Sequence, residues 1–120
     1  MNGDRVRVAD VTLGDAVTPI EAIRGGASAV AGAVAAQRPT GRLLVVTDSN
    51  IRDAYARPLV DALVAANRSA RLLCVDAGEG AKSPLVLATL WDDALAEPLD
   101  RGDAVVAVGG GVVGDLAGFL

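Results

Sequence analysis

The chain has 120 residues, 52% of them hydrophobic, and a formal net charge of −4 from 11 basic and 15 acidic residues. This length predicts one domain with one core, and the acidic excess without a basic run argues against a nucleic-acid partner. Histidine is absent and Cys74 is the single cysteine, so the composition excludes a histidine-based triad, a thiolate zinc site and an internal disulfide.

The chain shows no sequence feature of export or of a membrane span. Residues 1–5 include the charged Asp4 and Arg5 and form no apolar run, whereas a signal peptide has an apolar core. The longest uncharged apolar stretches fall short of the about 20 residues that cross a bilayer. We therefore expect a cytoplasmic protein without a membrane partner.

The first predicted elements are a strand, a helix and a second strand. Apolar alternation predicts a strand over residues 5–13. A pattern rich in Gly and Ala predicts a helix over residues 25–37, which ends before Pro39. A continuous apolar run predicts the next strand over residues 42–47.

A second helix is predicted over residues 51–67, with Ser49 or Asn50 as its cap. Pro58 lies inside this helix and is expected to bend it. The apolar stripe that would face the core consists of Tyr55, Leu59, Ala62, Leu63 and Ala66.

A buried strand and a third helix follow. The strand is predicted over residues 71–75, where Cys74 is expected as a small buried hydrophobe. Ser83 is a favourable cap and Pro84 a favourable first residue for a helix that ends before Pro98. The residues expected to point inward are Leu87, Leu90, Trp91, Ala94 and Leu95.

A glycine-rich turn follows a predicted strand over residues 104–108 and opens a helical pattern. Gly109, Gly111 and Gly114 have the G-x-G-x-x-G spacing of a dinucleotide fingerprint. Because glycine permits close backbone approach and unpaired N–H groups at a helix start attract anions, the turn predicts a phosphate cradle. A tight turn that only packs a helix against a strand is the alternative. The pattern reaches Leu120 after about two turns without a stop signal, so we expect the domain to continue.

Strands that alternate with helices predict an α/β fold, with a Rossmann-like parallel sheet and flanking helices. Ligands of such sheets bind outside the carboxyl ends of the strands. This rule selects the loops over residues 47–50, 76–83 and 109–115. We interpret residues 1–120 as one Rossmann-like domain in which these three loops build the binding site.

Each loop offers a different binding chemistry. Asp48 can accept hydrogen bonds from the hydroxyls of a ribose, and Asn50 adds a donor and an acceptor; helix capping is the alternative. Glu79 and Lys82 can hold a ribose or adenine and a phosphate, or form only a surface ion pair. Asp115 follows the glycines, where a negative charge also stabilises a helix start.

Together these motifs resemble the amino-terminal domain of the 3-dehydroquinate synthase family, one of the sugar-phosphate cyclases. The resemblance rests on residues 46–50, 78–83, 99–103 and 109–119. It implies that the chain is the truncated, NAD-binding amino-terminal domain of a two-domain enzyme. The cofactor-binding residues that it implies are Asp48, Asn50, Gly78, Glu79, Lys82, Gly110, Gly111, Val112, Val113, Gly114 and Asp115.

The resemblance also implies a reaction. The family converts the sugar phosphate 3-deoxy-D-arabino-heptulosonate 7-phosphate to 3-dehydroquinate and phosphate, in the shikimate pathway of aromatic amino acid biosynthesis. It uses NAD and a divalent metal, zinc or cobalt, and its members are expected to be homodimers. The metal ligands, a glutamate and two histidines, would follow residue 120. We therefore expect no catalytic or metal-binding residue in this chain and no activity of the chain alone. Another sugar-phosphate cyclase and a non-catalytic nucleotide-binding fragment are the alternatives.

Overall fold

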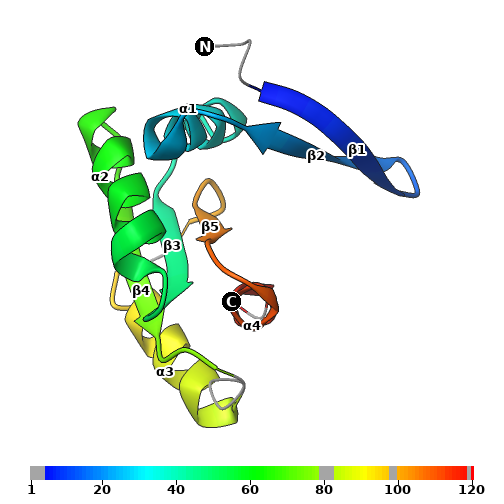
Figure 1. Cartoon of the computed structure of the whole chain (residues 1–120). Coiled ribbons are helices and arrows are strands. Elements are labelled where there is room, and N and C mark those ends of the chain that lie inside the picture. The colour runs from blue at the N-terminus through cyan, green and yellow to red at the C-terminus, as the bar shows by residue number, and fades with distance from the viewer. Residues whose placement is uncertain (1–4, 79–82, 98–99, 119) are drawn as a thin grey trace.

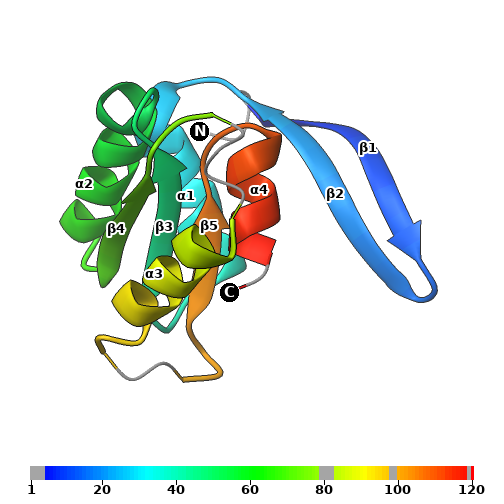
Figure 2. The same ribbon diagram turned by 90° about the horizontal axis from the view of Figure 1, so that it is seen from below.

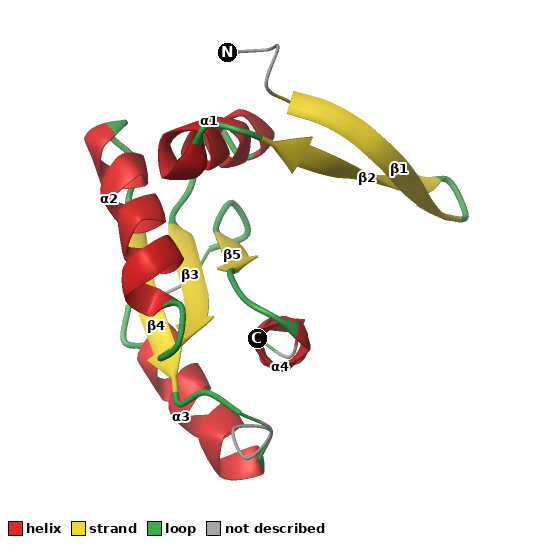
Figure 3. Cartoon of the chain, in the orientation of Figure 1, coloured by secondary structure: helices red, strands yellow, loops and turns green. Residues whose placement is uncertain are grey.

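A computed structural model describes residues 5–78, 83–97, 100–118 and 120 (Figure 1). None of the helices in these ranges is long and apolar enough to cross a membrane. The helices and strands, coloured by type in Figure 3, are β1 (Arg5–Leu13), β2 (Ala16–Ile23), α1 (Gly26–Gln37), β3 (Leu43–Asp48), the π-helical segment η2 (Arg52–Ala56), α2 (Arg57–Ala65), β4 (Ala70–Val75), α3 (Pro84–Ala94), β5 (Ala104–Ala107) and α4 (Gly111–Gly118).

A three-stranded parallel sheet forms the centre of the fold, with strand order β4-β3-β5. In its register Leu43 pairs with Ala70 on one side and with Ala104 on the other. Helices α1 and α2 pack on one face of the sheet, and α3 and α4 pack on the other. The predicted α/β, Rossmann-like arrangement of a parallel sheet with flanking helices is therefore confirmed.

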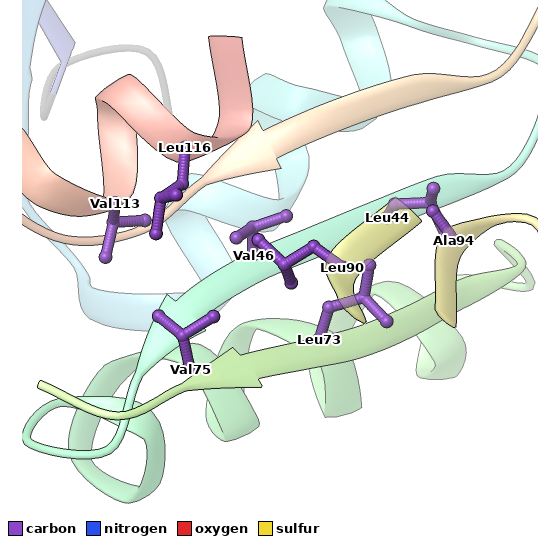
Figure 4. Packing of buried hydrophobic residues seen from close by; sticks show 8 residues of the cluster. All are labelled: Leu44, Val46, Leu73, Val75, Leu90, Ala94, Val113 and Leu116. Atoms are coloured by element: carbon purple, nitrogen blue, oxygen red, sulfur yellow. The ribbon is translucent and has the colours of Figure 1, made fainter. Parts of the chain in front are cut away.

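Two hydrophobic clusters fill the faces of the sheet because the side chains of β3 alternate between them. The cluster beneath α3 and α4, shown in Figure 4, consists of Leu44, Val46, Leu73, Val75, Leu90, Ala94, Val113 and Leu116. The cluster beneath α1 and α2 consists of Ala31, Leu43, Val45, Ala56, Leu59, Val60 and Leu63.

Complete burial is confined to the central strand. Residues 43–47 of β3 are all buried, as predicted. The complete burial predicted for β4 is wrong, and β5 is partly exposed as well, because each of these strands has a neighbour on one side only. Cys74 is exposed on β4 and is not the buried hydrophobe expected from the apolar run.

The predicted first strand is present as β1, but it pairs with a second strand that the sequence patterns did not reveal. Strand β2 runs antiparallel to β1 and contains Pro19, which weakens a strand prediction. The two strands form a hairpin that projects away from the sheet and its helices (Figure 2).

The predicted second helix is two elements, because a π-helical segment precedes α2. Pro58 lies in the first turn of α2, where a proline is tolerated, and not inside a bent helix. Neither Ser49 nor Asn50 caps the helix through its side chain. The π-helical segment shifts the phase of the apolar stripe before α2, so Tyr55 is exposed, and Ala66 is exposed because it lies beyond the end of α2. The buried residues are Ala56, Leu59, Val60 and Leu63.

Helix α3 begins as predicted but buries a narrower face. The Ser83 hydroxyl oxygen accepts a hydrogen bond from the backbone N–H of Val86 at 3.2 Å, and a proline follows the cap. Leu90 and Ala94 are buried. Trp91 and Leu95 are exposed, contrary to the prediction, because the helix packs over β4 at the edge of the sheet.

Candidate functional site at the carboxyl edge of the sheet

The chain reverses its direction of winding at the carboxyl edge of the sheet, between β3 and β5. After β3 the chain continues into α2 on one face, whereas after β5 it continues into α4 on the other face. Loops that leave neighbouring strands toward opposite faces open a crevice, and ligands of α/β proteins bind in such crevices. The fold therefore points to the loops after β3 and β5.

A cleft of about 720 Å³ lies at this position. Asp48 lines it from the end of β3, and Gly109 and Gly110 line it from the glycine turn. The structure thus brings two of the three predicted loops to one cleft. The full lining is Ile23, Gly26, Ala27, Val30, Asp48, Ile51, Ala54, Tyr55, Pro58, Leu59, Val108, Gly109 and Gly110.

Hydrogen bonds from the end of β3 hold the neighbouring loops in place. The buried Thr47 hydroxyl donates to the carbonyl oxygen of Val108 at 2.9 Å, directly before the glycine turn. The Ser49 hydroxyl oxygen accepts from the backbone N–H of Ala77 at 3.0 Å, in the loop after β4. These two side chains therefore position both flanking loops relative to Asp48.

Asp48 has one oxygen engaged in local structure and one available. Its Oδ1 accepts hydrogen bonds from the backbone N–H groups of Asn50 (2.9 Å) and Ile51 (3.2 Å). These bonds close a turn ahead of η2 and are not a helix cap, because the N-cap residue is Ile51 and no side chain caps the helix. Within the described residues no group donates a hydrogen bond to Oδ2, so this oxygen can accept one from a ligand hydroxyl in the cleft. Asn50 is exposed beside the cleft but does not line it.

The glycines of the turn separate into two kinds. Gly109 has a φ of +154°, and a Cβ on it would approach Val113 Cγ2 to 2.8 Å. The packing alternative therefore accounts for Gly109. Gly110, Gly111 and Gly114 have no atom within 4 Å of the position of a Cβ. Packing within the described residues does not require these three glycines, and the space around them would allow a ligand to approach the backbone closely.

The start of α4 limits which groups can reach a ligand. The side chain of Val113 is fully buried in the cluster beneath α3 and α4, and that of Val112 packs against this cluster. Only the backbone N–H groups of these two residues can therefore contact a ligand. The N–H of Gly114 already donates to the carbonyl oxygen of Gly110 at 3.1 Å. By helix geometry the N–H groups of the first turn have no partner inside the helix, and they point at the turn where an anion is favoured.

The other predicted residues lie nearby or outside the described part of the chain. Asp115 is exposed on α4. Gly78 follows β4 with a φ of +108°, a conformation that favours glycine. Glu79 and Lys82 lie outside the described residues.

Sequence reasoning missed the far wall of the cleft and the residues that position its loops. The far wall comes from the end of β2 and the start of α1, with Ile23, Ala27 and Val30. Tyr55 was assigned to the core but is 65% exposed and lines the cleft. A polar residue at the end of an apolar strand is the signal that could have identified Thr47.

The described residues fit an anionic dinucleotide better than a metal. The turn supplies backbone donors with open space around them, and Asp48 supplies an acceptor at the same cleft. Within the described ranges no group of three or more acidic or cysteine side chains is placed to hold a metal ion.

Comparison with protein families identifies relatives of the chain. Residues 72–120 match the family model of the 3-dehydroquinate synthase amino-terminal region. The chain is 49% identical over 79 residues to the 3-dehydroquinate synthase of Salinibacter ruber, covering 66% of this chain and 22% of the relative. It is 39% identical over 118 residues to the 3-dehydroquinate synthase of Bradyrhizobium diazoefficiens, a match that covers 98% of this chain and 31% of that relative. The chain thus spans less than a third of the length of these relatives.

A solved structure shows the same fold. The 2-deoxy-scyllo-inosose synthase complexed with carbaglucose-6-phosphate, NAD+ and Co2+ matches with a TM-score of 0.72 at 21% sequence identity. The match covers 92% of this chain and 29% of that chain. At this identity the likeness shows a common fold.

Proposed function

Because the chain belongs to the 3-dehydroquinate synthase family, to whose amino-terminal part it corresponds, we propose that it is the NAD-binding part of a 3-dehydroquinate synthase. The reaction in this proposal is the conversion of 3-deoxy-D-arabino-heptulosonate 7-phosphate to 3-dehydroquinate and phosphate. The enzyme would be a carbon–oxygen lyase of the shikimate pathway, located in the cytoplasm. Its substrate and metal residues would lie in a second domain.

The observation that carries the proposal is the open space around the glycine turn beside Asp48. Gly110 and Gly111 leave room for a pyrophosphate against the backbone, where the unpaired N–H groups that a helix start provides would favour an anion. Asp48 lines the same cleft, and its second carboxylate oxygen can accept a ribose hydroxyl. The proposed cofactor-binding residues are Asp48, Asn50, Gly78, Glu79, Lys82, Gly110, Gly111, Val112, Val113, Gly114 and Asp115.

NAD, when bound, supplies a transient oxidation of one substrate hydroxyl, which acidifies the neighbouring proton and allows phosphate to leave. The residues of this chain bind and orient the cofactor for that step. Thr47 and Ser49 fix the loops on which the binding groups lie. The described residues offer no metal site, so the zinc or cobalt of the proposed enzyme would be held outside them.

A substitution at Gly111 tests the binding element. Gly111→Val adds a branched side chain where a Cβ meets no protein atom, so the fold should persist while the pyrophosphate is excluded. We expect NAD affinity, measured by calorimetry on the 120-residue chain, to fall about tenfold or more. The matched control is Gly102→Val at the opposite edge of the sheet, where a Cβ also meets nothing within 4 Å.

Two results would contradict the proposal. One is equal NAD affinity for the wild type and the Gly111 variant, with circular dichroism showing that both are folded. The other is an equal loss of affinity in the Gly102 variant, because that would indicate a general effect of the added side chain and not a local site.

A further inference from the structure

Most of the cleft lining is apolar. The glycine turn offers backbone donors and Asp48 offers a carboxylate oxygen, whereas the other lining residues are glycines or carry aliphatic or aromatic side chains. Ligand pockets combine a few polar groups, which orient the ligand, with an apolar surface against which the rest of the ligand lies. A ligand of this cleft is therefore expected to carry an apolar or flat group beside the group that Asp48 binds.

Tyr55 is the large side chain of this apolar lining that remains open to solvent. It is 65% exposed, and it is the single tyrosine of the chain. An aromatic ring that is open at a cleft presents a flat surface on which a base can stack. The other large apolar side chains of the lining are half-buried or buried, namely Ile23, Val30, Ile51, Pro58, Leu59 and Val108.

Two consecutive hydrogen bonds fix the place of Tyr55 relative to Asp48. The N–H of Ile51 donates to Asp48 Oδ1 at 3.2 Å, and the N–H of Tyr55 donates to the carbonyl oxygen of Ile51 at 2.9 Å. The same carbonyl oxygen accepts from the N–H of Ala56 at 3.4 Å, which is the wider spacing of a π-helical turn. The acceptor for a ribose hydroxyl and the aromatic ring therefore belong to one hydrogen-bonded unit.

The π-helical segment η2 brings Tyr55 to the cleft. In a regular helix Tyr55 would share a stripe with Leu59 and Leu63, which are buried in the core. The wider turn of η2 instead leaves Tyr55 exposed in the cleft lining. Because π-helical turns are rare and occur frequently at functional sites, this placement is typical of a ligand-binding residue.

The groups that line the cleft match the successive parts of a nucleotide. In a dinucleotide each ribose lies between the pyrophosphate and a base. In the cleft Gly110 supplies part of the backbone cradle, Asp48 supplies the hydroxyl acceptor and Tyr55 supplies the aromatic surface. The reacting ring of the cofactor must reach the substrate, whose residues the proposed function assigns to a second domain. The apolar part of the cleft, which residues of this chain line, therefore fits the other base, adenine.

We propose that Tyr55 is a cofactor-binding residue whose ring stacks on the adenine of NAD in the apolar part of the cleft. This assignment rests on the proposed function and adds a residue that the family resemblance did not imply. The aromatic ring carries the interaction and the phenol hydroxyl does not, because stacking uses the face of the ring. Gly26 and Ala27 at the start of α1 line the same cleft, and a Cβ on Gly26 would meet no atom within 4 Å. These small residues leave space for the base.

Substitutions that remove or keep the ring test the proposal. Tyr55→Ala should weaken NAD binding about tenfold in calorimetry, whereas Tyr55→Phe should bind like the wild type because it keeps the ring. Both variants should fold because Tyr55 is mostly exposed, and circular dichroism checks this. The matched control is Val64→Ala, which shortens an exposed side chain of α2 outside the cleft and should leave the affinity unchanged.

Ligand fragments and NMR identify the base that Tyr55 contacts. ADP-ribose contains adenine but no nicotinamide, so Tyr55→Ala should weaken its binding as much as that of NAD. Nicotinamide mononucleotide contains no adenine, and its binding should not differ between the wild type and the variant. Because the chain has one tyrosine, the ring protons of Tyr55 are identified directly. We expect intermolecular nuclear Overhauser effects between these protons and the adenine protons of bound NAD.

The proposal would be overturned by unchanged NAD affinity in Tyr55→Ala, or by an equal loss in Tyr55→Phe or Val64→Ala. Overhauser effects from Tyr55 to the nicotinamide protons alone would overturn it as well. Failure of the proposed function gives a different result, because Gly111→Val would then leave NAD affinity unchanged whatever happens at Tyr55. A loss in Gly111→Val without a loss in Tyr55→Ala would retain the glycine cradle and refute only the role of Tyr55.

Discussion

The two ends of the parallel sheet are built from the same residue types, yet they differ in how much space surrounds them. At the amino edge Gly41 has a φ of +92°, and a Cβ on it would overlap the backbone carbonyl of Gly102. At the carboxyl edge a Cβ on Gly110 or Gly111 would meet no atom within 4 Å. Gly41 therefore serves close packing at the amino edge, whereas Gly110 and Gly111 leave open space at the carboxyl edge.

The acidic residues of the two edges differ in the same way. At the amino edge Asp103 accepts hydrogen bonds from the backbone N–H groups of Arg42 and Asp100, and it forms an ion pair with the Arg42 guanidinium at 2.9 Å. At the carboxyl edge Asp48 uses one oxygen to accept hydrogen bonds from the turn ahead of η2 and keeps the other available. We infer that a satisfied edge stabilises the fold, whereas an edge with available groups binds a ligand.

The largest expected effect on the free energy of unfolding is that of a methyl group added to Gly41 at the amino edge. Gly41→Ala combines a left-handed backbone conformation with a backbone overlap, so we expect a loss of about 2–4 kcal/mol in the free energy of unfolding. Gly110→Ala at the carboxyl edge should change it by no more than about 0.5 kcal/mol. Urea denaturation of both variants measures this contrast, and similar losses would remove the distinction between the edges.

The next effect is the pH dependence that Asp103 contributes. Hydrogen bonds from the backbone of Arg42 and Asp100 and the Arg42 guanidinium hold the pKa of Asp103 below its usual value. A lowered folded-state pKa stabilises the fold above the unfolded-state pKa of about 3.9, and this contribution is lost as the pH falls through the folded-state pKa. Asp103→Asn should therefore lower the melting temperature near neutral pH, and the difference from wild type should shrink on acidification.

Thermal unfolding followed by circular dichroism between about pH 7 and pH 3 checks this prediction. Asp61→Asn on the exposed side of α2 is the control, and its difference from wild type should not follow this profile. A difference for Asp103→Asn that stays constant over the whole range would contradict the role of the ionised carboxylate.

A smaller effect is expected at Thr47, whose side chain contributes both to the stability of the fold and to the position of the glycine turn. Thr47→Val keeps the shape of a buried side chain but removes its hydrogen bond to Val108, at a cost of about 1–2 kcal/mol. Because this bond holds the start of the glycine turn, NAD affinity should fall as well. Thr89→Val removes a comparable hydrogen bond on the exposed surface of α3. This control should change neither the free energy of unfolding nor the NAD affinity. Unchanged NAD affinity in the Thr47 variant would show that the bond does not position the turn.

The sequence was sufficient for the elements with strong local signals. Apolar runs predicted the parallel strands, and Ser83 with Pro84 predicted the start of α3, because these preferences act within a few residues. The glycine spacing correctly predicted a turn between a strand and a helix. It could not separate Gly109, which packs against Val113, from Gly111, which does not, since that difference depends on the neighbouring elements.

The errors arose where tertiary structure changes the phase or the neighbours of an element. The π-helical segment rotates Tyr55 out of the core and into the wall of the cleft, although the apolar stripe of a regular helix would bury it. The position of β4 at the edge of the sheet exposes Cys74 and leaves Trp91 above it partly uncovered. The register shift between Arg7 and Ala9 leaves Val8 unpaired and changes the alternation within β1, so the residues that share a face of the hairpin follow only from its register.

The most direct test of the contrast between the two edges is an NMR titration of the ¹⁵N-labelled 120-residue chain with NAD. We predict chemical-shift changes at the backbone amides of Gly110, Gly111 and Asn50 at the carboxyl edge. The amides of Arg42 and Gly102 at the amino edge should not change. Changes centred on the amino edge, or an unperturbed glycine turn at saturating NAD, would contradict the account.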